Sequence, residues 1–89
     1  MKHFKIKVTG IVQGVYFRAL AQEKAKALGV KGFVRNEADG SVYLEVEGNV
    51  AQLETLIQWC KQGPPRAKIE NVVSREGNFV GHKNFEILR

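Results

Sequence analysis

Hydrophobic and polar residues alternate over the first part of the chain. Phe4, Ile6 and Val8 fall on one side of an extended backbone, and lysines fall on the other side. A period of two residues is typical of a strand that buries one face. The pattern therefore predicts a strand over residues 3–12.

The period changes to that of a helix after Tyr16. Apolar side chains recur every three or four residues, while charged side chains between them face water. These apolar residues are Phe17, Leu20, Ala21, Ala25 and Leu28. Gly29 follows and suits a left-handed cap at the end of a helix. We predict a helix over residues 17–28.

A second helical pattern begins after Asn49, a residue type that often caps the start of a helix. Its apolar positions again lie three or four residues apart, and they are Leu53, Leu56, Ile57 and Cys60. The sequence Gly-Pro-Pro at residues 63–65 ends the pattern, because proline cannot continue a helix.

Four further segments have the composition of strands. Residues 30–36 and 41–48 flank a turn that contains Asp39 and Gly40, an arrangement that predicts a hairpin. Residues 68–75 and 85–89 are predicted as the last two strands, with Phe85 and Ile87 facing inward.

The elements up to residues 68–75 follow the order β-α-β-β-α-β, and residues 85–89 add a last strand. This order is typical of the ferredoxin-like α+β sandwich, an antiparallel sheet with two helices on one face. No linker or repeat interrupts the chain, so residues 1–89 are expected to form a single domain. The last strand is the expected long edge, and its charges discourage pairing with a second molecule. We expect a monomer.

Composition narrows the functional classes. Fourteen Lys and Arg against nine Asp and Glu give a net charge of +5, which favours an anionic ligand. The one cysteine cannot form an internal disulfide, and the first residues lack the apolar region of a signal peptide. No apolar run approaches the roughly 20 residues that a membrane helix needs. We expect a cytoplasmic protein with no membrane partner.

The segment 10–18, Gly-Ile-Val-Gln-Gly-Val-Tyr-Phe-Arg, joins the first strand to the first helix. Gly14 permits a positive φ, so successive backbone N–H groups can converge on an anion just before a helix N-terminus. Arg18 opposes the helix dipole unless an anion lies nearby. An alternative stays open, in which Arg18 is a solvated residue paired with an acid and Gly14 is only a turn.

Several chemistries find no support in the sequence. Residues 10–18 contain neither a Walker motif nor a Gly-x-Gly-x-x-Gly motif, and no Cys, Ser or His that could act as a nucleophile. His3 and His82 have no partner at ligand spacing and are expected to be exposed. We expect no metal and no cofactor. Cys60 is expected in the core, and Arg35 on the surface of the sheet.

Two segments of the chain resemble the acylphosphatase family, whose members hydrolyse carboxyl-phosphate anhydrides. The first segment matches at Gly10, Val12, Gln13, Gly14, Val15, Phe17 and Arg18. The second matches at Gly32, Phe33, Val34, Arg35, Asn36, Gly40, Val42 and Gly48. Glu37 departs from the pattern, because many relatives have a small hydroxyl residue there. Its carboxylate either modulates substrate affinity or points to solvent.

The resemblance implies the ferredoxin-like fold and a role for each matching residue. Arg18 would bind the phosphate of an acyl phosphate, and Asn36 would orient the attacking water. The backbone cradle for the phosphate would comprise Gln13, Gly14, Val15, Tyr16 and Phe17. Inorganic phosphate would be a product or an inhibitor.

Two other classes of protein remain as alternatives. An RNA-binding domain has the same order of elements, but its aromatic motif belongs on the third strand, where this chain has Glu45 and Glu47. Those acids would repel phosphates, so we expect no nucleic-acid partner. A non-catalytic or carbamoyl-phosphate-handling relative is the other alternative.

Overall fold

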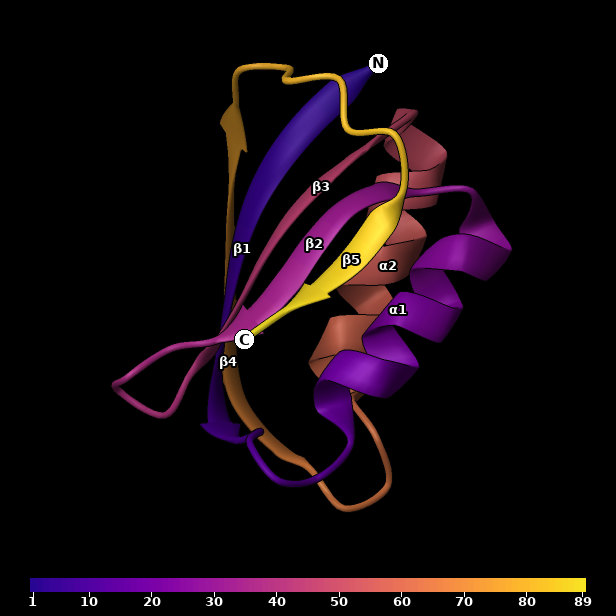
Figure 1. Ribbon diagram of the computed structural model, residues 1–89. Helices are drawn as coiled ribbons and strands as arrows, with labels where there is room; N and C mark the ends of the chain where they lie inside the picture. The colour runs from indigo at the N-terminus through magenta and orange to yellow at the C-terminus, as the bar shows by residue number, and fades with distance from the viewer.

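The computed structural model describes all 89 residues as a sheet covered on one face by two helices (Figure 1). The strands are β1 (Lys2–Ile11), β2 (Lys31–Asn36), β3 (Val42–Gly48), β4 (Lys68–Gly77) and β5 (Phe85–Leu88). The helices are α1 (Phe17–Leu28) and α2 (Val50–Gln62). This is the ferredoxin-like α+β fold, as predicted.

The sheet has the order β4-β1-β3-β2-β5. β3 is the central strand. β1 lies between β3 and β4 and is antiparallel to both, and β2 pairs antiparallel with β3. β5 instead runs parallel to β2, so the sheet is mixed rather than wholly antiparallel. The cause is the segment after β4, which crosses one end of the sheet before β5 starts (Figure 1).

The core lies between the helices and the inner face of the sheet. Alternate residues of the strands meet the apolar stripe of each helix, as the two periods predict. The buried apolar residues are Ile6, Val8, Val12, Val15, Phe17, Ala21, Ala25, Val30, Val34, Val42, Leu44, Val46, Leu53, Leu56, Cys60 and Phe85. Cys60 is therefore a core residue, and burial raises the pKa of its thiol to about 12.

The predicted caps are present at both helices. Gly29 ends α1 in the left-handed conformation, with φ of 78°. The Asn49 side chain accepts from the Gln52 backbone N–H, and the Gln52 side chain accepts in return from the Asn49 N–H. This reciprocal pair is a capping box, and it fixes the start of α2.

The long edge of the sheet is β4 rather than the C-terminal strand. β4 has 10 residues and pairs only with β1, whereas β5 has four residues. The prediction about the edge was wrong because β5 is short and lies along β2. Neither helix is long and apolar enough to cross a membrane.

Candidate active site

The loop between β1 and α1 is held in place by buried side chains at every second or third position. Val12, Val15 and Phe17 are each at least nine-tenths buried, and the Phe17 ring lies 5.2 Å from the ring of Trp59. The residues between them, which include Gly14, are left at the surface. The core therefore fixes the path of the loop while its backbone faces solvent.

Two residues of this loop adopt the left-handed conformation, Gly14 with φ of 73° and Tyr16 with φ of 65°. For Tyr16 this conformation costs about 1 kcal/mol. The backbone N–H groups from Gln13 to Phe17 donate to no acceptor in the protein, and no side chain caps α1. A row of free donors thus lies at the positive end of a helix, an arrangement that binds anions.

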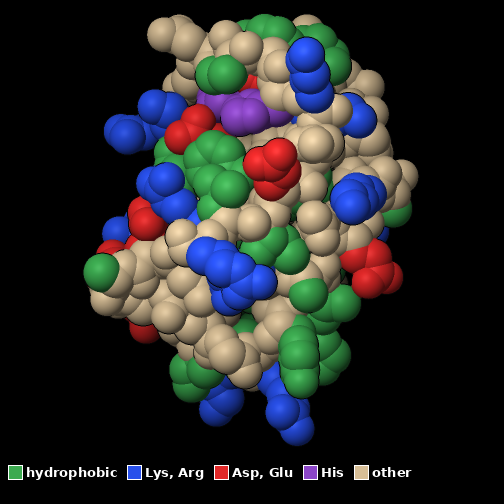
Figure 2. All heavy atoms as spheres, in the orientation of Figure 1, with side chains coloured by type: hydrophobic (Ala, Val, Ile, Leu, Met, Phe, Trp, Pro, Cys, Tyr) green, Lys and Arg blue, Asp and Glu red, His purple; other side chains and the backbone are tan.

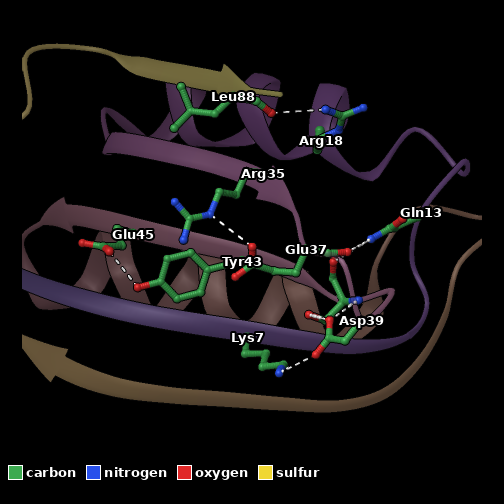
Figure 3. Close-up of polar contacts among 10 residues, drawn as sticks. Lys7, Gln13, Arg18, Arg35, Glu37, Asp39, Tyr43, Glu45 and Leu88 are labelled. Carbon is green, nitrogen blue, oxygen red and sulfur yellow. Dashed lines mark hydrogen bonds and ion pairs between the residues drawn. The ribbon is translucent and has the colours of Figure 1, made fainter.

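Arg18 lies in the first turn of α1, next to these free donors. Its guanidinium donates to the backbone carbonyl oxygen of Leu88 at 3.2 Å (Figure 3). No carboxylate lies within ion-pair distance of it. The alternative in which Arg18 is paired with an acid is therefore wrong. The carbonyl contact orients the side chain and leaves the positive charge uncompensated.

Asn36 is the last residue of β2, and it lines the same pocket as Gly14 and Arg18. The pocket has a volume of about 410 Å³. Its lining residues are Val12, Gly14, Tyr16, Phe17, Arg18, Ala19, Asn36, Ile87 and Arg89. The fold thus brings together the two candidate catalytic side chains, Arg18 and Asn36, from separate elements. Gln13 and Val15, two of the five residues predicted for the backbone cradle, do not line the pocket.

The Gln13 side chain connects the loop to the β2–β3 hairpin. Its amide nitrogen donates to the carbonyl oxygens of Glu37 at 2.8 Å and Ser41 at 2.9 Å (Figure 3). Both acceptors lie in the turn that follows Asn36. Gln13 therefore fixes the distance between the loop and the end of β2.

The acidic residues of the hairpin point away from the pocket. Glu37 accepts from Arg35 Nε at 3.2 Å, and Asp39 forms an ion pair with Lys7 at 2.8 Å (Figure 3). The hydrogen bond from Lys7, with those from Ser41, holds the pKa of Asp39 well below its usual range. No carboxylate side chain lines the pocket.

The last residues of the chain also contribute to the pocket, which the sequence did not indicate. Ile87 and Arg89 line it, and the Leu88 carbonyl oxygen accepts from Arg18. Their contribution follows from the parallel pairing of β5 with β2, which places residues 87–89 beside the end of β2. A backbone carbonyl has no signature in sequence. The second cation, Arg89, could have been found only by aligning these two strands.

The burial and the neighbours of His3 and His82 differ from the prediction. His3 is 1% exposed and lies between two carboxylates, with Nδ1 2.7 Å from Glu47 and Nε2 2.8 Å from Glu45. His82 is partly buried, and its ring stacks on that of His3 with centroids 6.1 Å apart. The two histidines are neither isolated nor exposed, because strand pairing and the 78–84 loop bring them together.

One further prediction about a single residue, Arg35, is confirmed. Arg35 lies on the outer surface of the sheet, with its guanidinium 4.8 Å from the centre of the Tyr43 ring. Trp59 is partly buried against the core. Neither lines the pocket.

The fold and the pocket together define a class: a small α+β protein with an anion-binding loop between its first strand and first helix. The protein-family model for Acylphosphatase matches residues 4–87 of this chain. A protein named Acylphosphatase from Anaeromyxobacter sp. (strain Fw109-5) is 50% identical over 76 residues, which cover 85% of this chain and 82% of that protein. The chain belongs to the acylphosphatase family and hydrolyses acyl phosphates.

Solved structures agree with this assignment. The crystal structure of acylphosphatase from Bacillus subtilis is 33% identical, with a TM-score of 0.96 over all of both chains. A structure titled full-length HypF in the phosphate- and nucleotide-bound form is 32% identical, with a TM-score of 0.88. This chain covers 12% of that longer protein, so the same fold also occurs as one part of a larger molecule.

Proposed function

We propose that the pocket hydrolyses the carboxyl-phosphate anhydride by direct attack of water on phosphorus. Arg18 and the backbone N–H groups of residues 13–17 bind the phosphoryl oxygens, and Asn36 orients the water. One observation carries this proposal: three residues with unbonded N–H donors, an arginine without an acidic partner and an asparagine line one pocket. The three residues with free donors are Gly14, Tyr16 and Phe17.

The electrostatics of this arrangement suit phosphoryl transfer. In its transition state, negative charge spreads over the three equatorial phosphoryl oxygens, and fixed donors that face them stabilise that charge. The guanidinium fork of Arg18 can bind two of these oxygens at once. The bond from Arg18 to the Leu88 carbonyl positions the fork before the substrate arrives.

The chemistry of the leaving group explains why so few side chains suffice. A carboxylate is a stable anion, so its departure needs no general acid. The alkoxide of a phosphate monoester would need protonation or a metal. The side chains around the pocket include no His, Cys, Asp or Glu, so they supply neither an acid nor metal ligands. We therefore propose a metal-free reaction that needs no cofactor.

The proton of the attacking water needs an acceptor, because the Asn36 amide is not a base. We assign this role to an oxygen of the substrate phosphate. Glu37 and Asp39 are the nearest acids in sequence, and each is paired with a cation outside the pocket. Their placement supports an acceptor on the substrate.

We also propose that the protein acts as a monomer in the cytoplasm, without a nucleic-acid partner. The exposed edge strand β4 carries charged residues such as Lys68, Glu70 and Arg75, which disfavour edge-to-edge pairing. The single cysteine, Cys60, is a free thiol, as is usual in a reducing compartment. Sedimentation should show one species at about the chain's mass of 10.0 kDa, and a concentration-dependent dimer would contradict the proposal.

An assay with benzoyl phosphate in excess chelator tests the catalytic proposal. Wild-type protein should hydrolyse it far above the uncatalysed rate, whereas the Asn36→Ala variant should lose most of this activity. A phosphate monoester serves as the control substrate and should not be hydrolysed. Loss of wild-type activity in chelator, or full activity of Asn36→Ala, would contradict the proposed mechanism.

A further inference from the structure

A cluster of metal-ligating side chains lies far from the active site. His3 is near the start of β1, Glu47 is its direct partner near the end of β3, and His82 is on the 78–84 loop. One ligand atom from each residue lies within 4.8 Å of the other two. Eight residues of β1 separate His3 from the active-site end of the sheet, about 26 Å of strand. In Figure 2 the histidines form a single purple patch beside acidic side chains.

We propose that His3, Glu47 and His82 form a binding site for one Zn²⁺ ion. Two imidazoles and one carboxylate are a donor set that zinc binds readily, with water as a fourth ligand. Such an ion would connect the sheet to the 78–84 loop, which leads into β5. The proposal concerns this cluster alone and does not depend on the proposed catalytic mechanism.

The surroundings of the cluster resemble the outer shell of a metal site. His3 Nε2 lies 2.8 Å from Glu45, which in turn accepts from the Tyr43 hydroxyl at 2.6 Å. A histidine that binds a metal through one nitrogen usually donates from the other to a carboxylate, which fixes the tautomer. Glu45 can therefore hold the proton of Nε2 in place and leave Nδ1 for the metal.

The Glu47 carboxylate is also held in place by hydrogen bonds. It accepts from the backbone N–H groups of Val80 at 2.6 Å, Gly81 at 3.0 Å and His82 at 2.8 Å. Ligating carboxylates are commonly held by such hydrogen bonds. Three successive N–H donors fix the orientation of this carboxylate and bring the loop with His82 to the cluster.

His82 supplies an independent observation. Its Nε2 atom is buried and has no hydrogen-bond partner in the protein. Buried polar atoms are almost always paired, because an unpaired one loses its bond to water without replacement. Coordination to a metal would satisfy this nitrogen.

A hydrogen bond links two of the proposed zinc ligands in this structure, His3 and Glu47. His3 Nδ1 and Glu47 Oε2 are 2.7 Å apart, a hydrogen-bond distance. Two ligands of a tetrahedral zinc ion are about 3.3 Å apart, so the ion would replace the proton between them and separate the atoms slightly. The proton passes to solvent, and His82 moves closer.

The chain has few other side chains that could bind zinc. The sequence contains two histidines and one cysteine. The cysteine, Cys60, is fully buried in the core between the helices and the sheet. Zinc bound with a stoichiometry of one can therefore be attributed to the His3–Glu47–His82 cluster.

Titration of tag-free, metal-stripped protein with ZnCl₂ in a calorimeter tests this site. We expect one ion per chain, and a rise in melting temperature when zinc is added, because the ion binds only the folded state. The His82→Ala variant should bind zinc at least about ten-fold more weakly. It should still fold, because His82 is partly exposed on a loop.

The matched control is Lys83→Ala, an exposed change one residue further along the same loop. It should bind zinc as the wild type does. Co²⁺ adds a spectroscopic readout, since a tetrahedral site with histidine ligands gives visible absorption bands that His82→Ala should lose. Absence of binding to wild-type protein, or equal binding by His82→Ala, would overturn the proposal. Hydrolysis of benzoyl phosphate in chelator is measured separately, so failure of either proposal can be recognised without the other.

Discussion

Tyr16 and Arg18 each contradict a local preference of the backbone. Tyr16 adopts a left-handed conformation that glycine favours, and Arg18 places a positive charge at the positive end of a helix. Neither choice stabilises the fold by itself. Sequences that are otherwise consistent with their fold tend to break such rules at functional sites. Both exceptions lie at the pocket that also contains Asn36.

Replacement of Arg18 by alanine should lower kcat/KM for benzoyl phosphate by at least about 100-fold, because it removes a fixed donor to the charge of the transition state. Stability should fall by no more than about 1 kcal/mol, the worth of one hydrogen bond to the Leu88 carbonyl. Steady-state kinetics and urea unfolding measure the two effects.

Arg35→Ala is the matched control for this variant, because Arg35 belongs to the second matching segment but lies over the Tyr43 ring outside the pocket. Its kcat/KM should stay within a few-fold of the wild-type value. A large loss in Arg35→Ala, or near-normal activity in Arg18→Ala, would show that the wrong arginine has been assigned.

Substitution of the hairpin acids should leave catalysis almost unchanged. Glu37→Gln and Asp39→Asn each remove a carboxylate that is paired with a cation outside the pocket. Because the proposed proton acceptor is the substrate, the pH dependence of kcat/KM should keep the wild-type shape in both variants. An acidic limb that disappears in either variant would identify that residue as the base.

At the scale of elements, most of the fold could be predicted because its signals are local. The apolar spacing of α1, the Gly29 cap and the Asn49 cap each depend on neighbouring residues, and the structure confirms all three. The motif residues Arg18 and Asn36 were identified by resemblance, and the fold brings them to one pocket.

Contacts between distant segments could not be predicted in this way. The parallel pairing of β5 with β2 adds Arg89 and the Leu88 carbonyl to the pocket, and the pairing of β1 with β3 buries His3 against Glu47. A periodic pattern indicates which face of a strand is buried, but it does not name the neighbouring strand. The environment of a polar residue such as His3 depends on that neighbour.

Two glycines of the matching segments should differ in their effect on stability. In Gly32→Ala the new methyl group would collide with the backbone of Glu45 in the paired strand, whereas in Gly14→Ala it would meet no atom within 4 Å. We expect Gly14→Ala to cost about 1–2 kcal/mol for its left-handed backbone alone. Gly32→Ala should cost more, because β2 and β3 must move apart. Equal losses in urea unfolding would contradict this reading.

At the scale of the whole molecule, the buried thiol of Cys60 should make stability depend on alkaline pH. Burial raises its pKa from 9.0 to about 12 in the folded state. The contribution of this thiol to stability is fully present below pH 9 and is lost as the pH rises toward 12. The reason is that the Cys60 thiol of the unfolded chain loses its proton at a lower pH than the thiol of the folded protein. At pH 10 the loss from this group should be on the order of 1 kcal/mol.

The measurement is the free energy of unfolding in urea at pH 7 and pH 10, for the wild type and for Cys60→Val. Valine has a similar size and does not titrate, so the variant keeps the alkaline response of all other groups. The wild type should therefore lose on the order of 1 kcal/mol more than the variant between the two pH values. Equal losses would mean that the thiol is accessible to hydroxide in the folded protein.

The position of β1 between β3 and β4 also determines how the chain can fold. β1 pairs with β3 and β4, and β2 pairs with β5, so each of these pairs joins segments separated by at least one complete helix. The β2–β3 hairpin is the only pair whose strands are adjacent in sequence. Closing the long loops costs entropy before the contacts repay it, so proteins of this kind fold slowly for their size. The pocket draws on β2, β5 and the loop after β1, and it is therefore complete only after the slow, non-local pairings have formed.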